Sequence, residues 1–120
     1  MSTELKIDEI GYWSEVKLAI LAEYARLYNQ ILRSNGLRSV YIDGFAGAGY
    51  HRAKGSDRII EGSPMRALKV MPPFDEFHFI DMDPLRAGAL SGLGDGRENV
   101  HVYEGDCNVI LIDDVFPKIK

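Results

Sequence analysis

This chain of 120 residues lacks the features of several common protein classes. Cys107 is the only cysteine, which excludes an internal disulfide and a cysteine-rich zinc site and favours a reducing compartment. No apolar run is long enough to span a membrane, and the first residues contain no signal-like hydrophobic region. We therefore expect a cytoplasmic protein that does not enter a membrane.

Clustered positive charge is also absent. The formal net charge is -4 at pH 7, and no dense run of lysine and arginine occurs. A general nucleic-acid-binding surface needs such a run to neutralise phosphates. His51, Arg52, Lys54 and Arg58 form one local basic loop that could meet a nucleic acid or an anionic ligand group, although exposed loop charge is usually only solvated.

The first third of the chain predicts a long amphipathic helix. Ser14 is a suitable N-cap, and Asn35-Gly36 is a typical helix stop. The apolar residues that share one face of this helix are expected to pack against a sheet. They are Val16, Ile20, Tyr24, Leu27, Tyr28 and Ile31.

The remainder alternates between predicted strands and helices. The strands are "RSVYID" (38–43), "EFHFID" (76–81) and "NVHVYEGD" (99–106). Helices are expected from Ser63 to about Val70, after Asp83-Pro84, and from Val109 to about Phe116 with Asn108 as the cap. Residues 50–62 are interpreted as an inserted polar loop. This alternation predicts an α/β fold with a parallel sheet of Rossmann type and right-handed crossovers. We interpret 1–120 as one partial domain, with an N-terminal helical segment (1–36) and a core (37–120).

The stretch "VYIDGFAGAGYHR" (40–52) delivers a glycine-rich turn at the end of the first strand. A phosphate-binding P-loop needs Gly-Lys-Ser/Thr, but Gly49 is followed by Tyr50 and His51. The dinucleotide fingerprint Gly-x-Gly-x-x-Gly/Ala, started at Gly47, would place Arg52 where a small residue is required. The remaining pattern is an aspartate, Asp43, followed by glycines.

Such a turn suits a ligand with a cationic amine and no phosphate. The carboxylate of Asp43 can receive the amine, and the glycines let the backbone bend beneath the ligand. S-adenosylmethionine presents such an amine. The candidate cofactor residues in this turn are Asp43, Gly44, Phe45, Ala46, Gly47 and Gly49.

Several segments in order resemble the class I S-adenosylmethionine-dependent methyltransferases, and among them the three-Cys-motif partner proteins. The segments are "YWSEVKLAIL", "VYIDGFAGAG", "EGSPMRAL", "FHFIDMDP" and "GDCNVIL". The resemblance implies that the turn after strand one holds the methionine part of the cofactor. It further implies that Asp81, after strand two, holds the ribose hydroxyls, and that Asp106, after strand three, holds the adenine amino group.

The resemblance also implies the sheet order 3-2-1 and a fourth strand beside strand one, which this sequence does not contain. The fourth strand normally carries the catalytic motif, so no catalytic residue is assigned and we expect the N-terminal half of such a domain. The part "SVYID" (39–43) of strand one has no proline and no charge before Asp43, so its open edge is expected to recruit a second copy of the chain. A non-catalytic module for a partner protein of the three-Cys-motif type is one alternative. A Rossmann-type oxidoreductase or NTPase is another, disfavoured by Arg52 and the missing Gly-Lys.

Several polar residues have simpler interpretations. Asp83 precedes a proline and is expected to cap a helix rather than bind a ligand. Asp106 could instead start a turn beside Asn108. His78 and His101 alternate with apolar residues in strands, so neither resembles a metal ligand pair and no metal is expected.

Overall fold

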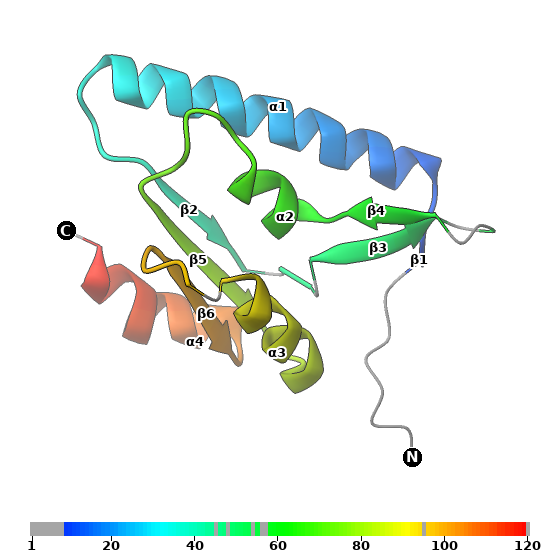
Figure 1. Cartoon of the computed structure of the whole chain (residues 1–120). Coiled ribbons are helices and arrows are strands. Elements are labelled where there is room, and N and C mark those ends of the chain that lie inside the picture. Colours follow the sequence, from blue (N-terminus) through cyan, green and yellow to red (C-terminus); the bar gives the residue numbers. More distant parts are fainter. Residues whose placement is uncertain are drawn as a thin grey trace.

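A parallel three-stranded sheet forms the centre of the molecule (Figure 1). The computed structural model describes residues 9–44, 46–47, 49–53, 55, 58–94 and 96–119. The strands β2 (Val40–Asp43), β5 (Glu76–Asp81) and β6 (Val100–Glu104) pair in parallel in the order β2-β5-β6. All six residues of β5 are buried, as expected for the central strand. The fold is therefore mixed α/β, and the expected order of the three strands is confirmed.

Helices cover both faces of this sheet. On one face α1 (Tyr12–Ser34), α2 (Ser63–Leu68) and α3 (Pro84–Leu93) enclose a core that contains Phe77 and Phe79 of β5. On the other face Ile80 packs against a helical segment made of α4 (Cys107–Ile110), η1 (Leu111–Val115) and η2 (Phe116–Lys118). The alternation of side chains along β5 thus divides the core into two clusters.

The predicted helix stop at Asn35-Gly36 is confirmed, but the predicted start is wrong. Gly36 has a left-handed backbone with φ of 69°, and the Leu37 N–H donates to the Leu32 carbonyl at 2.9 Å. This is the usual way in which a glycine closes a helix. The helix begins at Tyr12, and its N-cap, Gly11, makes no side-chain cap, so Ser14 lies within the first turn.

The later helices match their predictions in part. α2 starts at Ser63 as expected but ends at Leu68, two residues before the predicted end. Asp83 caps α3 by accepting from the Leu85 N–H at 3.0 Å, which confirms its expected role. The cap predicted at Asn108 is wrong, because α4 begins at Cys107 and Asp106 is its cap.

A second, small sheet replaces the predicted polar loop. β3 (Tyr50–Ala53) pairs antiparallel with β4 (Ile59–Glu61) and parallel with the short β1 (Glu9–Ile10). A salt bridge of 3.0 Å between Arg58 and Glu15 joins this hairpin to α1. The prediction of a loop over 50–62 is therefore wrong, because cross-strand pairing stabilises a segment whose side chains carry no strong apolar alternation. Lys54, one of the predicted loop cations, lies outside the described residues.

The rotation of α1 about its axis differs from the prediction. The inward positions are Leu18, Ala22, Ala25, Asn29 and Leu32, while Ile20, Tyr24, Leu27, Tyr28 and Ile31 of the predicted buried face are exposed. α1 is the longest helix, with 23 residues, and no helix in the described part of the chain is long and apolar enough to cross a membrane.

Polar contacts to the segment before β5 explain this rotation. The side-chain amide of the fully buried Asn29 donates to the Pro72 carbonyl, and Arg33 donates to the Pro73 carbonyl at 2.7 Å. Arg33 also pairs with Asp75 at 3.1 Å. The small side chains of Ala22 and Ala25 allow the helix to approach the sheet on this side. Polar anchoring and close approach therefore outweigh the larger apolar face.

We predict that Asn29→Ala lowers the free energy of unfolding by about 1 kcal/mol, because it removes the hydrogen bond from a fully buried side-chain amide to the partly buried Pro72 carbonyl. Chemical denaturation measures the change. Gln30→Ala is the control, since Gln30 is the exposed neighbour and should change stability by no more than about 0.5 kcal/mol. Equal stability of the Asn29 variant and the wild type would contradict the anchoring role of this side chain.

Candidate functional site

A cavity of about 510 Å³ opens at the carboxyl ends of β2 and β5. Its volume lies within the range of roughly 300–1,000 Å³ that is typical of small-molecule sites. The carboxyl edge is also where open α/β sheets bind ligands. A hollow of about 580 Å³ beside Arg33, Leu37 and Asp75 lies at the opposite end of the strands. The residues that line the cavity are Leu18, Gly44, Ala46, Gly47, His51, Ser63, Asp81, Met82 and Arg86.

Asp81 supplies a buried carboxylate to the wall of this cavity. It is the last residue of β5 and is only 7% exposed. One carboxylate oxygen accepts from the Gly47 N–H at 2.8 Å, and the other accepts from the Asp83 N–H at 2.9 Å. Because an ionised carboxylate has about four acceptor positions, two remain for a ligand.

The glycine turn is attached to the end of β5. The Ala46 N–H donates to the Ile80 carbonyl at 3.0 Å, next to the bond from Gly47 to Asp81. Gly47 has a φ of 72°, a conformation that favours glycine. Gly49 has a φ of 96°, and a Cβ there would lie 2.5 Å from the Leu93 Cδ1 atom. The left-handed backbone at Gly47 and Gly49 therefore favours glycine, and a side chain at Gly49 would also displace the Leu93 side chain of α3.

Asp43 lies at the end of β2 and reaches the cavity through another side chain. Its carboxylate accepts a hydrogen bond from the hydroxyl of Ser63, the first residue of α2. Ser63 lines the cavity, whereas Asp43 does not. A ligand amine that approached Asp43 would therefore contact Ser63 as well.

Asp106 occupies a different position from the other predicted cofactor residues. It is exposed, caps α4 by accepting from the Asn108 N–H at 2.8 Å, and does not line the cavity. Its neighbour Cys107 packs against the glycine turn, since a Cβ added to Gly44 would lie 3.3 Å from the Cys107 Cβ. Asp106 is thus near the same edge of the sheet, although the cavity does not include it.

The structure unites part of the predicted set and adds other residues. Gly44, Ala46, Gly47 and Asp81 line one cavity, and Gly49 belongs to the same turn. Phe45 lies outside the described residues. The sequence did not point to Leu18, Ser63, Met82 or Arg86 as site residues. His51 was among the loop cations for which contact with a nucleic acid or an anionic ligand group was considered, and it does line the cavity. The position of Ser63 as the first residue of a helix after the turn was the one available signal.

The cavity contains groups of both charge signs. Asp81 supplies a carboxylate, and Arg86 and His51 supply basic side chains. Arg86 Nε lies 3.7 Å from the carboxylate of Asp83. Asp83 follows the lining residue Met82 but does not line the cavity itself. A ligand with both a cationic and an anionic group would find a counterpart for each.

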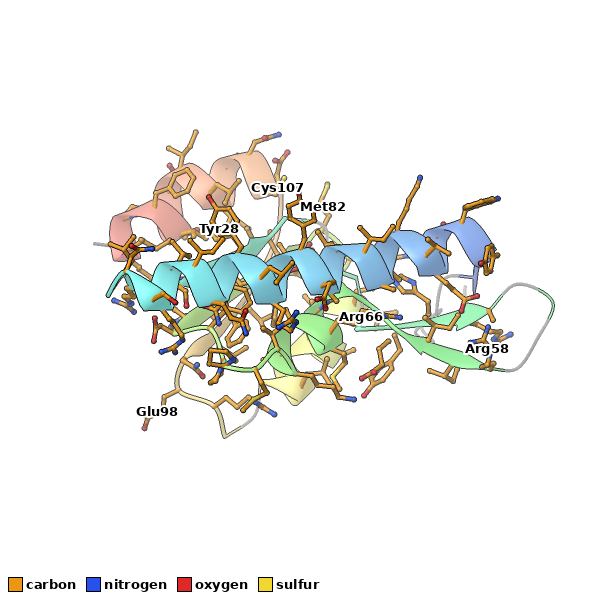
Figure 2. The ribbon with its side chains drawn as sticks, turned by 90° about the horizontal axis from the view of Figure 1, so that it is seen from above. Tyr28, Arg58, Arg66, Met82, Glu98 and Cys107 are labelled. Carbon is orange, nitrogen blue, oxygen red and sulfur yellow. The ribbon has the colours of Figure 1, made fainter. Side chains whose placement is uncertain are left out.

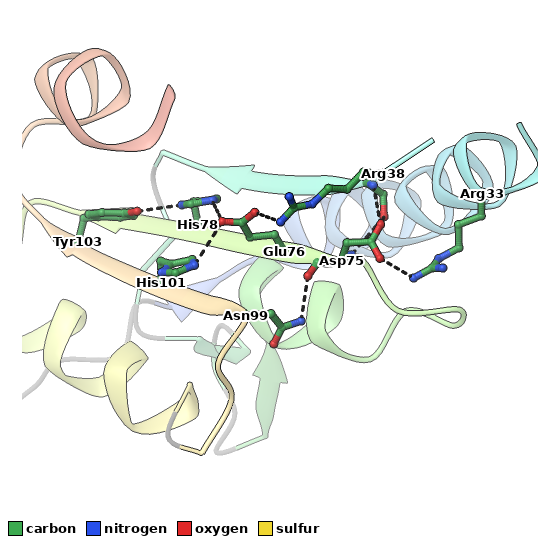
Figure 3. A network of polar contacts seen from close by, with 9 residues as sticks. Arg33, Arg38, Asp75, Glu76, His78, Asn99, His101 and Tyr103 are labelled. Atoms are coloured by element: carbon green, nitrogen blue, oxygen red, sulfur yellow. Dashed lines mark hydrogen bonds and ion pairs between the residues drawn. The ribbon is translucent and has the colours of Figure 1, made fainter. Parts of the chain in front are cut away.

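A second polar cluster lies on the sheet face that carries α4, toward the amino ends of the strands (Figure 3). The carboxylate of Glu76 is buried and faces His78 Nε2 at 2.9 Å and His101 Nε2 at 3.3 Å. Arg38 pairs with the other carboxylate oxygen, and His78 Nδ1 lies 2.9 Å from the Tyr103 hydroxyl. Because a carboxylate only accepts, His78 Nε2 is the donor and Nδ1 accepts from Tyr103.

The Glu76, His78 and His101 side chains have the composition of a metal site but not its geometry. One ligand atom from each lies within 4.8 Å of the others. The two imidazole rings, however, are stacked, with an interplanar angle of 16° and centroids 4.8 Å apart. A metal ion lies in the plane of each ligating imidazole, and nearly parallel planes do not meet at one point. We therefore interpret the cluster as a hydrogen-bonded network and assign no metal to it.

Burial lowers the pKa of His78 below its ordinary value. The fully buried imidazole loses hydration, and the charges of His101 and Lys118 act in the same direction, while Glu76 opposes them. The unfolded chain thus binds a proton at higher pH than the folded chain does. Stability from this group is complete above the ordinary pKa and is lost as the pH falls through the lowered value.

We predict that the thermal midpoint falls as the pH is lowered from about 7 to 5, the window just below the ordinary histidine pKa. His78→Gln should flatten this dependence, because glutamine keeps hydrogen-bonding capacity but does not titrate. His101→Gln, which changes a half-exposed ring, is the matched control and should keep most of the slope. An unchanged slope in the His78 variant would assign the pH dependence to another group.

A scan against protein-family models finds no match, and a search of curated proteins finds no significant similarity.

Proposed function

We propose that this chain binds S-adenosylmethionine in the cavity at the carboxyl edge of the β2-β5-β6 sheet. The observation that carries the proposal is the position of Asp81, whose carboxylate lines the cavity and is held beside the glycine turn. A Rossmann-type fold and membership of the class I methyltransferase-like proteins are parts of the same proposal. They rest on the sequence resemblance and agree with the α/β architecture.

Each part of the cofactor has a counterpart among the residues at this edge. Asp43, together with Ser63, would receive the amine of the methionine part, and His51 or Arg86 would receive its carboxylate. The two remaining acceptor positions of Asp81 would take the ribose hydroxyls. Asp106 would take the adenine amino group, a role that requires the ligand to extend past the cavity toward α4.

The charge of the site favours this cofactor over phosphate-bearing nucleotides. The carboxylates of Asp43 and Asp81 flank the glycine turn, and they would repel a pyrophosphate at that place. The turn also lacks the lysine of a P-loop. When bound, S-adenosylmethionine supplies an electrophilic methyl group, but we assign no residue of this chain to the transfer step.

A non-catalytic partner-binding module is the second candidate function. The exposed apolar face of α1 favours it, since large apolar patches on a surface usually mark interaction sites. The resemblance suggests a partner protein of the three-Cys-motif type. The single cysteine suits a cytoplasmic location for either function.

We predict that Asp81→Asn weakens binding of S-adenosylmethionine about ten- to a hundredfold, the equivalent of about 1.5–3 kcal/mol for a lost charge-assisted hydrogen bond. Asp83→Asn is the matched control, because asparagine also caps helices and Asp83 does not line the cavity. Calorimetric titration measures both affinities, and thermal melting shows whether each variant folds. Equal losses in two folded variants, or unchanged affinity for Asp81→Asn, would overturn the assignment of Asp81 to the ligand.

A further inference from the structure

One side of α1 presents a continuous apolar surface to solvent. Six of its large side chains are between 46% and 69% exposed. They recur at helical spacing, so they form a single stripe along the helix. In Figure 2, which looks down on α1, Tyr28 lies on the opposite side of this helix from Arg66 of α2. The stripe consists of Ile20, Leu21, Tyr24, Leu27, Tyr28 and Ile31.

The stripe continues into a groove beside β2. The groove has a volume of about 310 Å³ and lies between α1 and the outer strand of the sheet. Its lining is apolar or aromatic throughout: Leu21, Tyr24, Ala25, Tyr28, Val40, Tyr41, Ile42 and Phe74. We call the stripe and this groove together the α1–β2 surface.

The groove ends at a strand edge that has no partner among the described residues. β2 pairs with β5 on one side, and no described strand pairs with its other side. Val40, Tyr41 and Ile42 carry neither charge nor proline, which are the usual protections of an edge strand. The backbone N–H and C=O groups of this edge can therefore form hydrogen bonds with another strand.

We propose that the α1–β2 surface binds a second copy of this chain across a two-fold axis. With the axis perpendicular to the sheet, β2 pairs antiparallel with β2 of the second copy and the two sheets become one. The same rotation leaves both α1 helices on one face of the joined sheet, side by side. Their apolar stripes then cover each other, so a single operation satisfies the strand edge and buries the exposed side chains.

The size of the surface agrees with a stable dimer. If a large side chain presents roughly 200 Å² when free, the six residues of the stripe expose on the order of 600 Å² per copy. Two copies would bury roughly 1,200 Å² through these side chains alone, the lower limit for specific interfaces, and the paired β2 edges would add to it. The two tyrosines suit this position, because each has an apolar ring and a hydroxyl that can stay hydrated at the rim.

A second copy fits better than a membrane surface or an unrelated helix. Lipid offers no hydrogen bonds for the open edge of β2, and a helix would cover the stripe without pairing that edge. A second copy meets both needs: its β2 can form hydrogen bonds with the open edge, and its α1 can cover the apolar stripe. Pairing of two copies does not depend on the proposed cofactor binding, because the α1–β2 surface and the cavity have different lining residues.

Light scattering coupled to size-exclusion chromatography across the micromolar range tests the proposal. The wild type should be dimeric, and Tyr28→Lys and Ile31→Lys should each raise the dissociation constant about tenfold or more, because each would bury a charge among the apolar side chains of the stripe. Both residues are exposed, so the folded monomer should not depend on them. The variants should therefore melt at the same temperature as the wild type when the wild type is diluted until it is also monomeric. The substitutions are placed on α1 because Ile42 also packs in the core.

Ile59→Lys is the matched control, since Ile59 is 51% exposed on β4, away from the α1–β2 surface. It should leave the dimer intact. Hydrogen exchange supplies the second readout, and amides of β2 should exchange more slowly in the dimer than in the Ile31→Lys monomer. A monomeric wild type, equal effects of Ile31→Lys and Ile59→Lys, or β2 amides with the same exchange in both states would overturn the proposal.

Discussion

The carboxyl end of β5 depends on one buried aspartate. The side chain of Asp81 accepts from the Gly47 and Asp83 N–H groups, and its main-chain carbonyl accepts from the Gly105 N–H at 3.0 Å. These bonds connect the turn after β2, the start of α3 and the end of β6. A buried carboxylate is costly unless hydrogen bonds compensate for its lost hydration, so the three segments and the charge stabilise one another. Asp81 thereby fixes the part of the cavity wall that the glycine turn and the start of α3 provide.

The same arrangement gives the two ends of the sheet different chemistry. At the carboxyl end, backbone N–H groups and the glycine turn leave acceptor capacity on Asp81 that faces a cavity. At the amino end, Glu76 is already engaged by His78, His101 and Arg38. Both clusters contain a buried carboxylate at an end of β5. Asp81 itself lines a cavity, whereas the hollow at the amino end is lined by Arg38 and not by Glu76, with which Arg38 is already paired. This difference is why we assign ligand binding to the carboxyl end.

The central sheet could be predicted from the sequence because its strands are short segments with many β-branched and aromatic residues. "EFHFID" corresponds to β5 without a shift, and Asn35-Gly36 marks the end of α1 as expected. The glycine turn and Asp81 could also be assigned to the site from the sequence. The turn follows a predicted strand and Asp81 ends another, so both are expected at the carboxyl edge of the sheet. Ser63 and Arg86 were not visible as site residues, because their contribution depends on how α2 and α3 approach the turn.

Two features could not be predicted from local pattern alone. The hairpin of β3 and β4 is stabilised by cross-strand pairing and by the contact of Arg58 with Glu15, which are distant in the sequence. The rotation of α1 is decided by the bond from Asn29 to Pro72, 43 residues away, against a larger apolar face. Long-range polar contacts therefore override the hydrophobic periodicity, and the apolar face that the sequence assigns to the core becomes the exposed α1–β2 surface.

Calorimetric titration of the unmodified chain with S-adenosylmethionine, S-adenosylhomocysteine, NAD and ATP tests whether the cavity beside Asp81 binds S-adenosylmethionine. We predict saturable binding of the first two, which share the adenosine and amino-acid groups that the residues around Asp81 would contact. We predict much weaker or no binding of NAD and ATP, whose phosphates would meet the carboxylates of Asp43 and Asp81. Binding of NAD or ATP without the methionine-bearing ligands, or binding of none of the four, would contradict the proposed site.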